Sequence, residues 1–331
     1  MKIFSKQIFQ SVVAGFLLPL VLLLVVMGAS AQAEPDQTPT DSPTTLPAGT
    51  TEGAIPELPL YLPVQLENSV VNWELEEYLV GVLLAEMPAS FEMEALKAQA
   101  VAARTYALKC HYKGYKHLGA ICVKSTCCQG YCSVDTFLAN GGTQEQVHKI
   151  RLAVSQTKGE VLIYGGALIE ATYFACSGGK TEDAQAVWGT DVPYLQAVES
   201  PGEEQAPEYE QVKVYSAEEL ASLLGITTTV SPENWLGMVT YTDGGGVATM
   251  EIAGVTYRGT TLRSLLQLRS TMFSVEWTES GLLFLTRGHG HRVGMSQYGA
   301  EVMALDGSSY VEILKYYYLG TDVVQYEEIS P

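Results

Sequence analysis

One carboxylic acid, Glu86, stands at the end of an otherwise apolar segment and directly before Met87-Pro88. A carboxyl group in such a place is expected to be partly removed from water, which favours its neutral form and raises its pKa. A carboxylic acid with a raised pKa can donate a proton near neutral pH and then act as a base. The alternative is a glutamate that simply faces solvent at a helix end, which is a common arrangement.

Two cations, Lys97 and Arg104, lie seven residues apart in an Ala-rich segment. On a helix this spacing places them on one face, two turns apart. There they could bind an acidic or carbonyl-rich substrate, although cations on a helix surface usually do no more than solvate it.

Four of the six cysteines fall within eleven residues, close to His111 and His117. Thiolate and imidazole groups suit Zn²⁺, whereas outside the cytoplasm the same thiols could form disulfides. The spacing matches no standard zinc pair, so both interpretations stay open. A structural site is favoured over a catalytic one. The cysteines are Cys110, Cys122, Cys127, Cys128, Cys132 and Cys176.

A glycine-punctuated run, 288–299, places His291 and Gln297 near the start of an expected helix. Such a backbone can approach a ligand closely, so the run indicates a binding site. It is neither a phosphate loop nor a dinucleotide-binding fingerprint. The stretch around Ser177 does not form a hydrolase nucleophile elbow either.

Helices and short strands alternate irregularly along the chain and would position these groups. The apolar spacing predicts a helix over 75–85, which Pro88 ends, and an Ala-rich helix over 91–109. A hairpin is expected around Gly165-Gly166, and a strand meander lies further along the chain. This mixture predicts an α+β fold with mostly antiparallel strands.

The charge balance narrows the class of partner. The 331 residues include 19 basic and 37 acidic side chains, a net charge of −18. A nucleic-acid binder needs clustered Lys and Arg, and so does a protein that docks to anionic lipid. The acidic charge balance of this chain argues against both kinds of partner. A carbohydrate partner remains open.

The N-terminal segment sets the expected location. Residues 1–33 carry Lys2 and Lys6 before a long apolar run, which predicts a retained membrane anchor or an uncleaved signal. The alternative is cleavage after Ala31-Gln32-Ala33, whose small residues are typical of a signal-peptidase site. Residues 34–57 are rich in Pro, Thr and acidic residues, a composition typical of a disordered linker. The folded unit is expected at 58–326, outside the cytoplasm by the positive-inside rule.

Several motifs together resemble the stage II sporulation protein D family. Glu86-Met87-Pro88 is followed by ALKAQAVAARTYA, and the later motifs come in the family's order across nearly all of residues 60–325. The later motifs are SGGKTE, VWGTDVPYLQAV, VGMSQYGA and the final ILKYY.

The resemblance implies a lytic transglycosylase that acts on peptidoglycan strands stripped of their stem peptides. Glu86 matches the family's catalytic acid/base, with no cofactor needed for the chemistry. Five residues fall at family positions tied to activity or in family motifs, and we assign them to substrate binding. They are Lys97, Arg104, Ser177, His291 and Gln297.

Members from clostridia hold a zinc with one histidine and two cysteines, which here implies a structural zinc on His117, Cys122 and Cys128. Cys127 stands where a histidine is frequent, and Cys132 is a further thiol that blurs the assignment. Arg292 replaces a usual glycine, which puts the shape of its loop in doubt.

The family also implies an anchored protein on the extracytoplasmic side of the membrane, in the forespore engulfment space. The implied partners are glycan strands, the companion amidase protein P and the scaffold protein M. One alternative is a glycan-binding activator of such an amidase without catalysis of its own. A second alternative is a zinc hydrolase that uses the Cys/His cluster.

Overall fold

The computed structural model describes residues 60–113, 117–207 and 209–328, all within one compact unit. The expected anchor (1–33) and linker (34–57) lie outside the described residues. Among the described helices none is both long and apolar enough to cross a bilayer.

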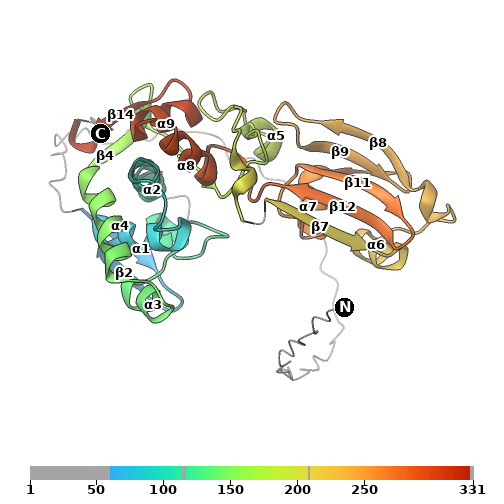
Figure 1. The fold of residues 1–331 in the computed structure, drawn as a ribbon, viewed down its shortest axis with the longest axis horizontal. Coiled ribbons are helices and arrows are strands. Elements are labelled where there is room, and N and C mark those ends of the chain that lie inside the picture. Colours follow the sequence, from blue (N-terminus) through green and yellow to red (C-terminus); the bar gives the residue numbers. More distant parts are fainter. Residues whose placement is uncertain (1–59, 114–116, 208, 329–331) are drawn as a thin grey trace, which may run out of the picture. The chain divides into compact units, whose positions relative to one another are not determined.

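One hydrophobic core belongs to a helical body, which we define as the described residues of 60–207 and 288–328. The long helix α2 runs through this core, with α1, α4, α8, α9 and strand β4 around it (Figure 1). The helices are α1 (Leu75–Glu86), α2 (Met93–Lys113), α3 (Val134–Ala139), α4 (Gln144–Gln156), α5 (Ala184–Trp188), α8 (Gln297–Leu305) and α9 (Tyr310–Tyr317).

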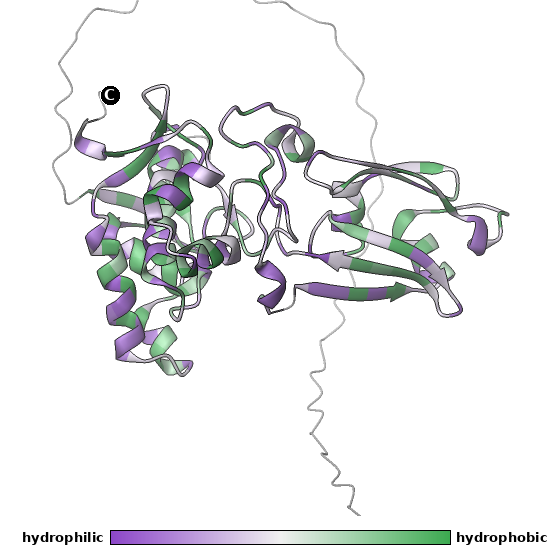
Figure 2. Cartoon of the chain, turned by 45° about the horizontal axis from the view of Figure 1, so that its top comes forward, coloured by the Kyte–Doolittle hydropathy of each residue, from purple (hydrophilic) through white to green (hydrophobic). Residues whose placement is uncertain are grey.

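Helix α2 can occupy this central place because small side chains line it. Ala95, Ala98, Ala102 and Ala103 have no exposed surface, so neighbouring helices approach the α2 backbone closely. By contrast α4 is amphipathic and buries only four residues, so its polar face meets water (Figure 2).

Short strands complete the helical body. Strands β2, β1 and β3 form one sheet, and β14, β4 and β5 form another. A parallel pair, β6 with β13, brings the segment before Ser177 beside the segment before α8. Their bounds are β1 (Tyr61–Gln65), β2 (Val70–Glu74), β3 (Ile121–Cys122), β4 (Glu160–Tyr164), β5 (Ala167–Leu168), β6 (Tyr173–Phe174), β13 (Met295–Ser296) and β14 (Asp322–Gln325).

A second hydrophobic core belongs to a β-rich region, the described residues of 209–287. It has two three-stranded antiparallel sheets, in the orders β11-β12-β7 and β10-β9-β8. Their elements are β7 (Glu210–Tyr215), α6 (Ala217–Leu224), β8 (Leu236–Tyr241), β9 (Val247–Ile252), β10 (Val255–Arg258), α7 (Gly259–Leu265), β11 (Phe273–Thr278) and β12 (Gly281–Arg287).

A buried ion pair of the helical body holds a turn of the β-rich region through hydrogen bonds. Arg292 lies 3.5 Å from Glu182, and neither side chain has more than 1% of its surface exposed. Arg292 also donates to the Gly244 carbonyl at 2.6 Å, and Thr242 donates to Glu182 at 2.6 Å. Thr242 and Gly244 lie in the β8–β9 turn, so charged groups of the helical body hold this turn.

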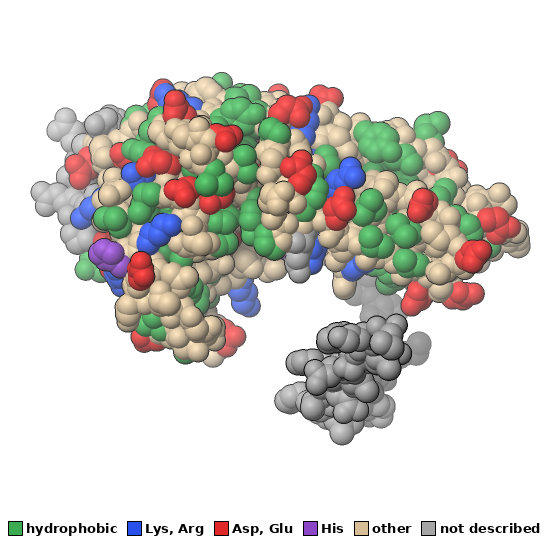
Figure 3. Space-filling view, viewed as in Figure 1, with side chains coloured by type: hydrophobic (Ala, Val, Ile, Leu, Met, Phe, Trp, Pro, Cys, Tyr) green, Lys and Arg blue, Asp and Glu red, His purple; other side chains and the backbone are tan. Residues whose placement is uncertain are grey.

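The predicted α+β class with mostly antiparallel strands is confirmed. Most helices expected from periodicity are present, but the Ala-rich helix is displaced and extends over Met93–Lys113. The separate core of the β-rich region was not expected. Acidic side chains are spread over the face shown in Figure 3, in keeping with the net charge of −18.

Candidate active site and metal cluster

A pocket of about 1170 Å³ brings together side chains from both regions. The helical body contributes Glu86, His291 and Gln297, three of the residues that the sequence singled out. The β-rich region contributes Arg263 and Gln267, from α7 and the turn after it. A pocket of this size with aromatic walls and a few polar groups is typical of a ligand site.

Glu86 is the last residue of α1, and Pro88 explains why the helix ends there. The residue before a proline is pushed out of the helical conformation, and Met87 is accordingly extended, with φ −127° and ψ 142°. The Gly130 N–H donates to Glu86 Oε1 at 2.6 Å, which holds the carboxyl group in place.

Burial raises the pKa of Glu86 above its ordinary value. The hydrogen bond from Gly130 and the amide of Gln297 oppose this rise without cancelling it. Desolvation therefore dominates, and the neutral acid persists to higher pH than in an exposed glutamate. This is the state that a proton donor requires.

A buried chain of polar groups forms the wall beside Glu86. Gln129 accepts from the Tyr78 hydroxyl at 3.1 Å and donates to the Tyr173 hydroxyl at 2.8 Å. Burial raises the pKa of Tyr173 well above its usual value, so this hydroxyl stays neutral. Because both polar atoms of the Gln129 side chain are hydrogen-bonded, the loop that carries Gly130 has a fixed position.

Gln297 begins α8, and its buried side-chain amide lies close enough to Glu86 to lower the pKa of that carboxyl group. The amide therefore helps to hold the Glu86 carboxyl group in the pocket.

His291 packs against the rings of Phe174 and Trp188. Burial lowers its pKa to about 4, so the ring is neutral at pH 7. Its Nδ1 accepts from the Val293 N–H at 3.1 Å, which leaves Nε2 to carry the proton in the neutral ring.

Three residues assigned to substrate binding lie outside the pocket lining, and this corrects the prediction from sequence. Arg104 has no exposed surface and pairs with Glu76 at 2.6 Å. Ser177 also has none, and its hydroxyl donates to Glu203 at 3.0 Å. In this structure neither side chain can reach a glycan, because each is enclosed by protein.

Lys97 is partly exposed but belongs to a different neighbourhood. It pairs with Glu94 at 2.7 Å and stands 5.7 Å from the centre of the Tyr310 ring. These contacts tie α2 to α9, so the cation acts within the helical body.

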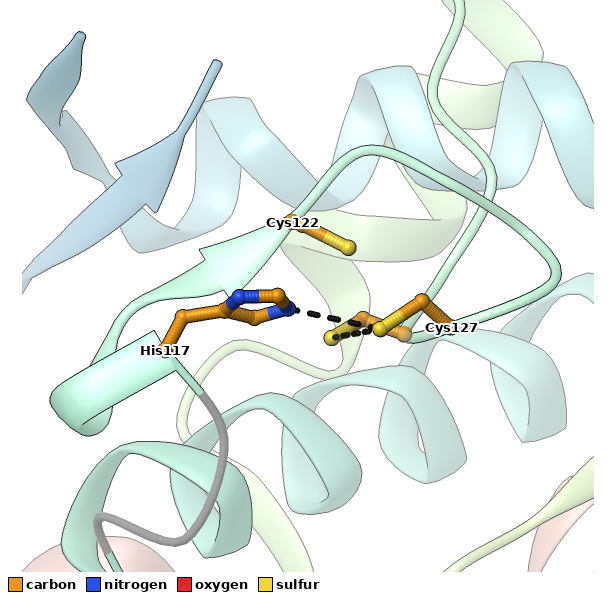
Figure 4. Close-up of side chains that lie close together, drawn as sticks. His117, Cys122 and Cys127 are labelled. Atoms are coloured by element: carbon orange, nitrogen blue, oxygen red, sulfur yellow. Dashed lines mark hydrogen bonds between the residues drawn. The ribbon is translucent and has the colours of Figure 1, made fainter. Parts of the chain in front are cut away.

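A cluster of four metal-ligating side chains lies at the edge of this pocket. The donor atoms of His117, Cys122, Cys127 and Cys128 all lie within 4.8 Å of one another. In Figure 4 the imidazole of His117 points at Cys127, with Nε2 3.3 Å from Sγ. The sequence assigned three of these residues, and Cys127 joins them.

The donor set fits a tetrahedral zinc. Zinc–sulfur and zinc–nitrogen bonds imply donor separations of roughly 3.5–3.8 Å, and the Cys127 and Cys128 sulfur atoms are 3.9 Å apart. None of the six thiols forms a disulfide. Cys132 lies outside the cluster and contacts the Ser133 carbonyl.

Sequence reasoning missed several residues of the pocket wall, Arg263 above all. Trp188 and Gln129 were also missed, although both lie in or next to recognisable motifs. Arg263 stands in a segment without any motif, and only the fold brings it to the pocket.

Comparisons with known proteins point to the same family as the motifs in the sequence. A family model described as "Stage II sporulation protein" matches residues 65–164, a stretch that contains Glu86 and the metal cluster. The chain is 37% identical to "Stage II sporulation protein D" of Bacillus subtilis, over 95% of this chain and 94% of that protein. It is 38% identical to the protein of the same name from Bacillus amyloliquefaciens, over 82% of each.

A more distant relative bears another name. The "Amidase enhancer" of Bacillus subtilis is 31% identical over 75% of this chain and 40% of its own length.

Proposed function

The chain belongs to the stage II sporulation protein D family, and we propose that it is a peptidoglycan lytic transglycosylase. It cleaves the bond between N-acetylmuramic acid and N-acetylglucosamine in peptide-free strands, and the products end in 1,6-anhydro-muramic acid. The observation that carries the proposal is a half-buried carboxylic acid in a pocket large enough for sugars.

Glu86 acts first as an acid and then as a base. Its proton passes to the oxygen of the glycosidic bond as this bond breaks. The substrate's own acetamido oxygen offsets the positive charge that develops at the sugar carbon. The Glu86 carboxylate then takes the proton of the C6 hydroxyl, whose oxygen closes the anhydro ring. General acid–base assistance of this kind contributes roughly 10²–10⁴-fold.

Neighbouring groups support both steps. The Gly130 N–H binds the carboxylate form, so Glu86 keeps its position after it loses the proton. The Gln297 amide lies beside the Glu86 carboxyl group, neutral His291 lines the pocket, and Trp188 offers an aromatic face to a sugar ring.

A second carboxylate, Glu170, also lines the pocket. Glycosidases that hydrolyse usually need two carboxyl groups, so the product must decide between hydrolysis and ring closure. An anhydro product is lighter by one water than a hydrolysed one.

Mass spectrometry of products from peptide-free strands tests the proposal. Wild type should release anhydro-muramic ends, and Glu86→Gln should lower their rate of release at least about 10²-fold. Glu170→Gln is the matched control and should keep most of the rate. A folded Glu86→Gln variant with full activity, or wild-type products that carry reducing ends, would refute the proposal.

The name of the relative called amidase enhancer favours a second candidate function. In this case the pocket would bind glycan without cleaving it, and the protein would stimulate a partner amidase. Glu86→Gln should then leave stimulation of the amidase intact while wild type releases no anhydro product.

We further propose that His117, Cys122, Cys127 and Cys128 hold a structural zinc. Four protein ligands leave no open position, which distinguishes this site from a catalytic zinc and disfavours a zinc hydrolase. Bound zinc would supply cross-linking of the loop that leads to Gly130. Cys127→Ser should lower the zinc content of purified protein, whereas Cys132→Ser should not.

The remaining parts of the proposal concern location and partners. Residues 1–33 would anchor the protein in the cell membrane, and residues 34–57 would hold the folded unit away from the bilayer on the extracytoplasmic side, in the forespore engulfment space. The proposed partners are glycan strands, the sporulation amidase protein P and the scaffold protein M. Fractionation of cells that produce the full chain or the chain from residue 34 onward tests the anchor.

A further inference from the structure

We propose that Arg263, in the β-rich region, binds the lactyl carboxylate of a muramic acid residue and so makes the pocket select peptide-free strands. This inference rests on the proposed function and adds to it a specificity-determining residue. The sequence assigns substrate binding to Lys97 and Arg104, which the structure places outside the pocket.

The placement of Arg263 is fixed by its helix. It lies on α7, next to the fully buried Leu262, which packs into the second core. Its Nε–H donates to the Arg269 carbonyl at 3.2 Å, which holds the root of the guanidinium group. Its terminal nitrogen atoms are not needed for this bond, and the residue lines the pocket that contains Glu86.

Among the described residues that line this pocket, Arg263 is the one lysine or arginine. No ion pair joins it to a carboxylate of the described residues, unlike Arg104, Arg292, Arg151 and Arg287. Burial lowers its pKa from a very high value, yet an arginine keeps its charge in proteins. A half-buried guanidinium without a counterion is costly, and an anionic ligand would remove that cost.

The rest of the described lining offers an anion no second cation. Glu170 is an acidic residue of the lining, His291 is neutral, and the chain carries a net charge of −18. Among the described residues of the lining, an anionic substrate group therefore has its one cationic partner at Arg263. The planar guanidinium matches a carboxylate with two parallel hydrogen bonds.

A glycan strand offers such a carboxylate only after its peptides are removed. In an intact strand the lactyl group of muramic acid forms an amide with the first residue of the stem peptide, which removes the charge. Removal of the peptide restores a carboxylate on every second sugar. A cation in the pocket wall thus distinguishes the two kinds of strand by charge alone.

The experiment compares peptide-free strands with the same strands after conversion of their lactyl carboxylates to methyl amides. With wild-type protein, kcat/KM for anhydro products should be about 10- to 100-fold higher on the carboxylate strands, as expected for a charged hydrogen-bonded pair. Arg263→Gln should lose this preference, with most of the loss in KM, and should process amide strands nearly as wild type does. Arg263→Lys should restore part of the preference.

Arg287→Gln is the matched control, because Arg287 belongs to the same region but is exposed and paired with Glu210. It should retain the full preference. If wild type treats both strands alike, or if folded Arg263→Gln keeps the preference, the assignment of Arg263 is wrong although the proposed reaction stands.

A binding measurement separates this inference from the reaction itself. Glu86→Gln should bind carboxylate strands more tightly than amide strands, and the double variant with Arg263→Gln should bind both alike. Should wild type release no anhydro product while this binding difference is present, the transglycosylase fails and the role of Arg263 remains. Equal binding of both strands by Glu86→Gln refutes that role, even if Arg263→Gln does not fold.

Discussion

The helical body and the β-rich region meet at one pocket but supply it with different kinds of groups. The helical body provides Glu86, whose carboxyl group is held by the Gly130 N–H within the same region. The β-rich region provides Arg263, which is held by one bond from Nε and lacks a carboxylate partner among the described residues. The acid is thus positioned by its own core, and the cation is available to a ligand.

In the proposed reaction the helical body carries the proton donor, and the β-rich region carries the cation that selects the substrate. The stretch that matches the family model, 65–164, lies wholly in the helical body. A proton donor needs burial and fixed neighbours, and a packed helical core supplies both. A cation that distinguishes substrates must instead reach the ligand, and a second core can carry it to the opposite wall. The two regions must then keep a fixed relation, which is what Arg292 and Glu182 secure.

The largest effect is expected when this link is broken by Arg292→Met. Glu182 would be left charged with 1% of its side chain exposed, and carbonyl groups such as that of Gly244 would lose their donor. Removal of one partner from a buried pair costs about 3–5 kcal/mol of unfolding free energy, and this pair belongs at the upper end. Denaturant unfolding measures the loss.

Hydrogen exchange of the same variant tests whether the two regions lose their protection separately. Protection should fall first at the β8–β9 turn, around Thr242 and Gly244, and persist in α2. Uniform loss of protection in both regions would mean that the helical body and the β-rich region form one cooperative unit. The exposed pair of Arg287 with Glu210 offers a control, since Arg287→Met should cost less than about 1 kcal/mol.

A somewhat smaller effect is expected at Arg104, whose partner Glu76 keeps 13% of its side chain exposed. Arg104→Met should cost about 3 kcal/mol of unfolding free energy, the lower end for a broken buried pair. Lys97→Met should cost at most about 1 kcal/mol, because its pair with Glu94 is partly solvated. Neither should change kcat/KM per folded molecule, which glycan digestion with parallel thermal melts would measure.

The double variant Glu76→Leu/Arg104→Met sharpens this point. It removes both charges, so much of the lost stability should return. If the restored protein folds but does not cleave glycan, Arg104 acts on substrate after all, and the helical body holds both the acid and the cation.

The sequence predicted much of the helical body because local signals agree there. Pro88 fixed the end of α1, alanines marked α2, and Glu86 stood out as an acid in apolar surroundings. The metal residues were predicted through family resemblance, because their spacing alone left zinc and disulfides open. Their convergence depends on the turn at His117, where φ is +45°.

Burial and long-range contact could not be predicted from spacing. Lys97 and Arg104 were expected on one face with access to substrate, yet solvation depends on which helix covers that face. Glu76 and α4 enclose Arg104, and both are remote in sequence. Arg263 was missed for the converse reason. Nothing nearby in sequence distinguishes it, and only the docking of the β-rich region brings it into the pocket.

The smallest expected effect concerns the stability cost of the acid itself. The pKa of Glu86 is raised in the folded protein from an unfolded value near 4.5. Between these two values the folded state holds a proton that the unfolded state has released, so unfolding free energy falls as pH rises through this window. Above the window the loss is complete. Gln cannot ionise, so Glu86→Gln should melt at a higher temperature than wild type at pH 8 and at the same temperature at pH 4.

An exposed glutamate in the same region gives the control. Glu145→Gln, on the solvent side of α4, should leave the melting temperature unchanged at both pH values. If Glu86→Gln is no more stable than wild type at pH 8, then water reaches the carboxyl group freely. Glu86 would then titrate as an ordinary surface acid, and the helical body would offer no better setting for a proton donor than the β-rich region does.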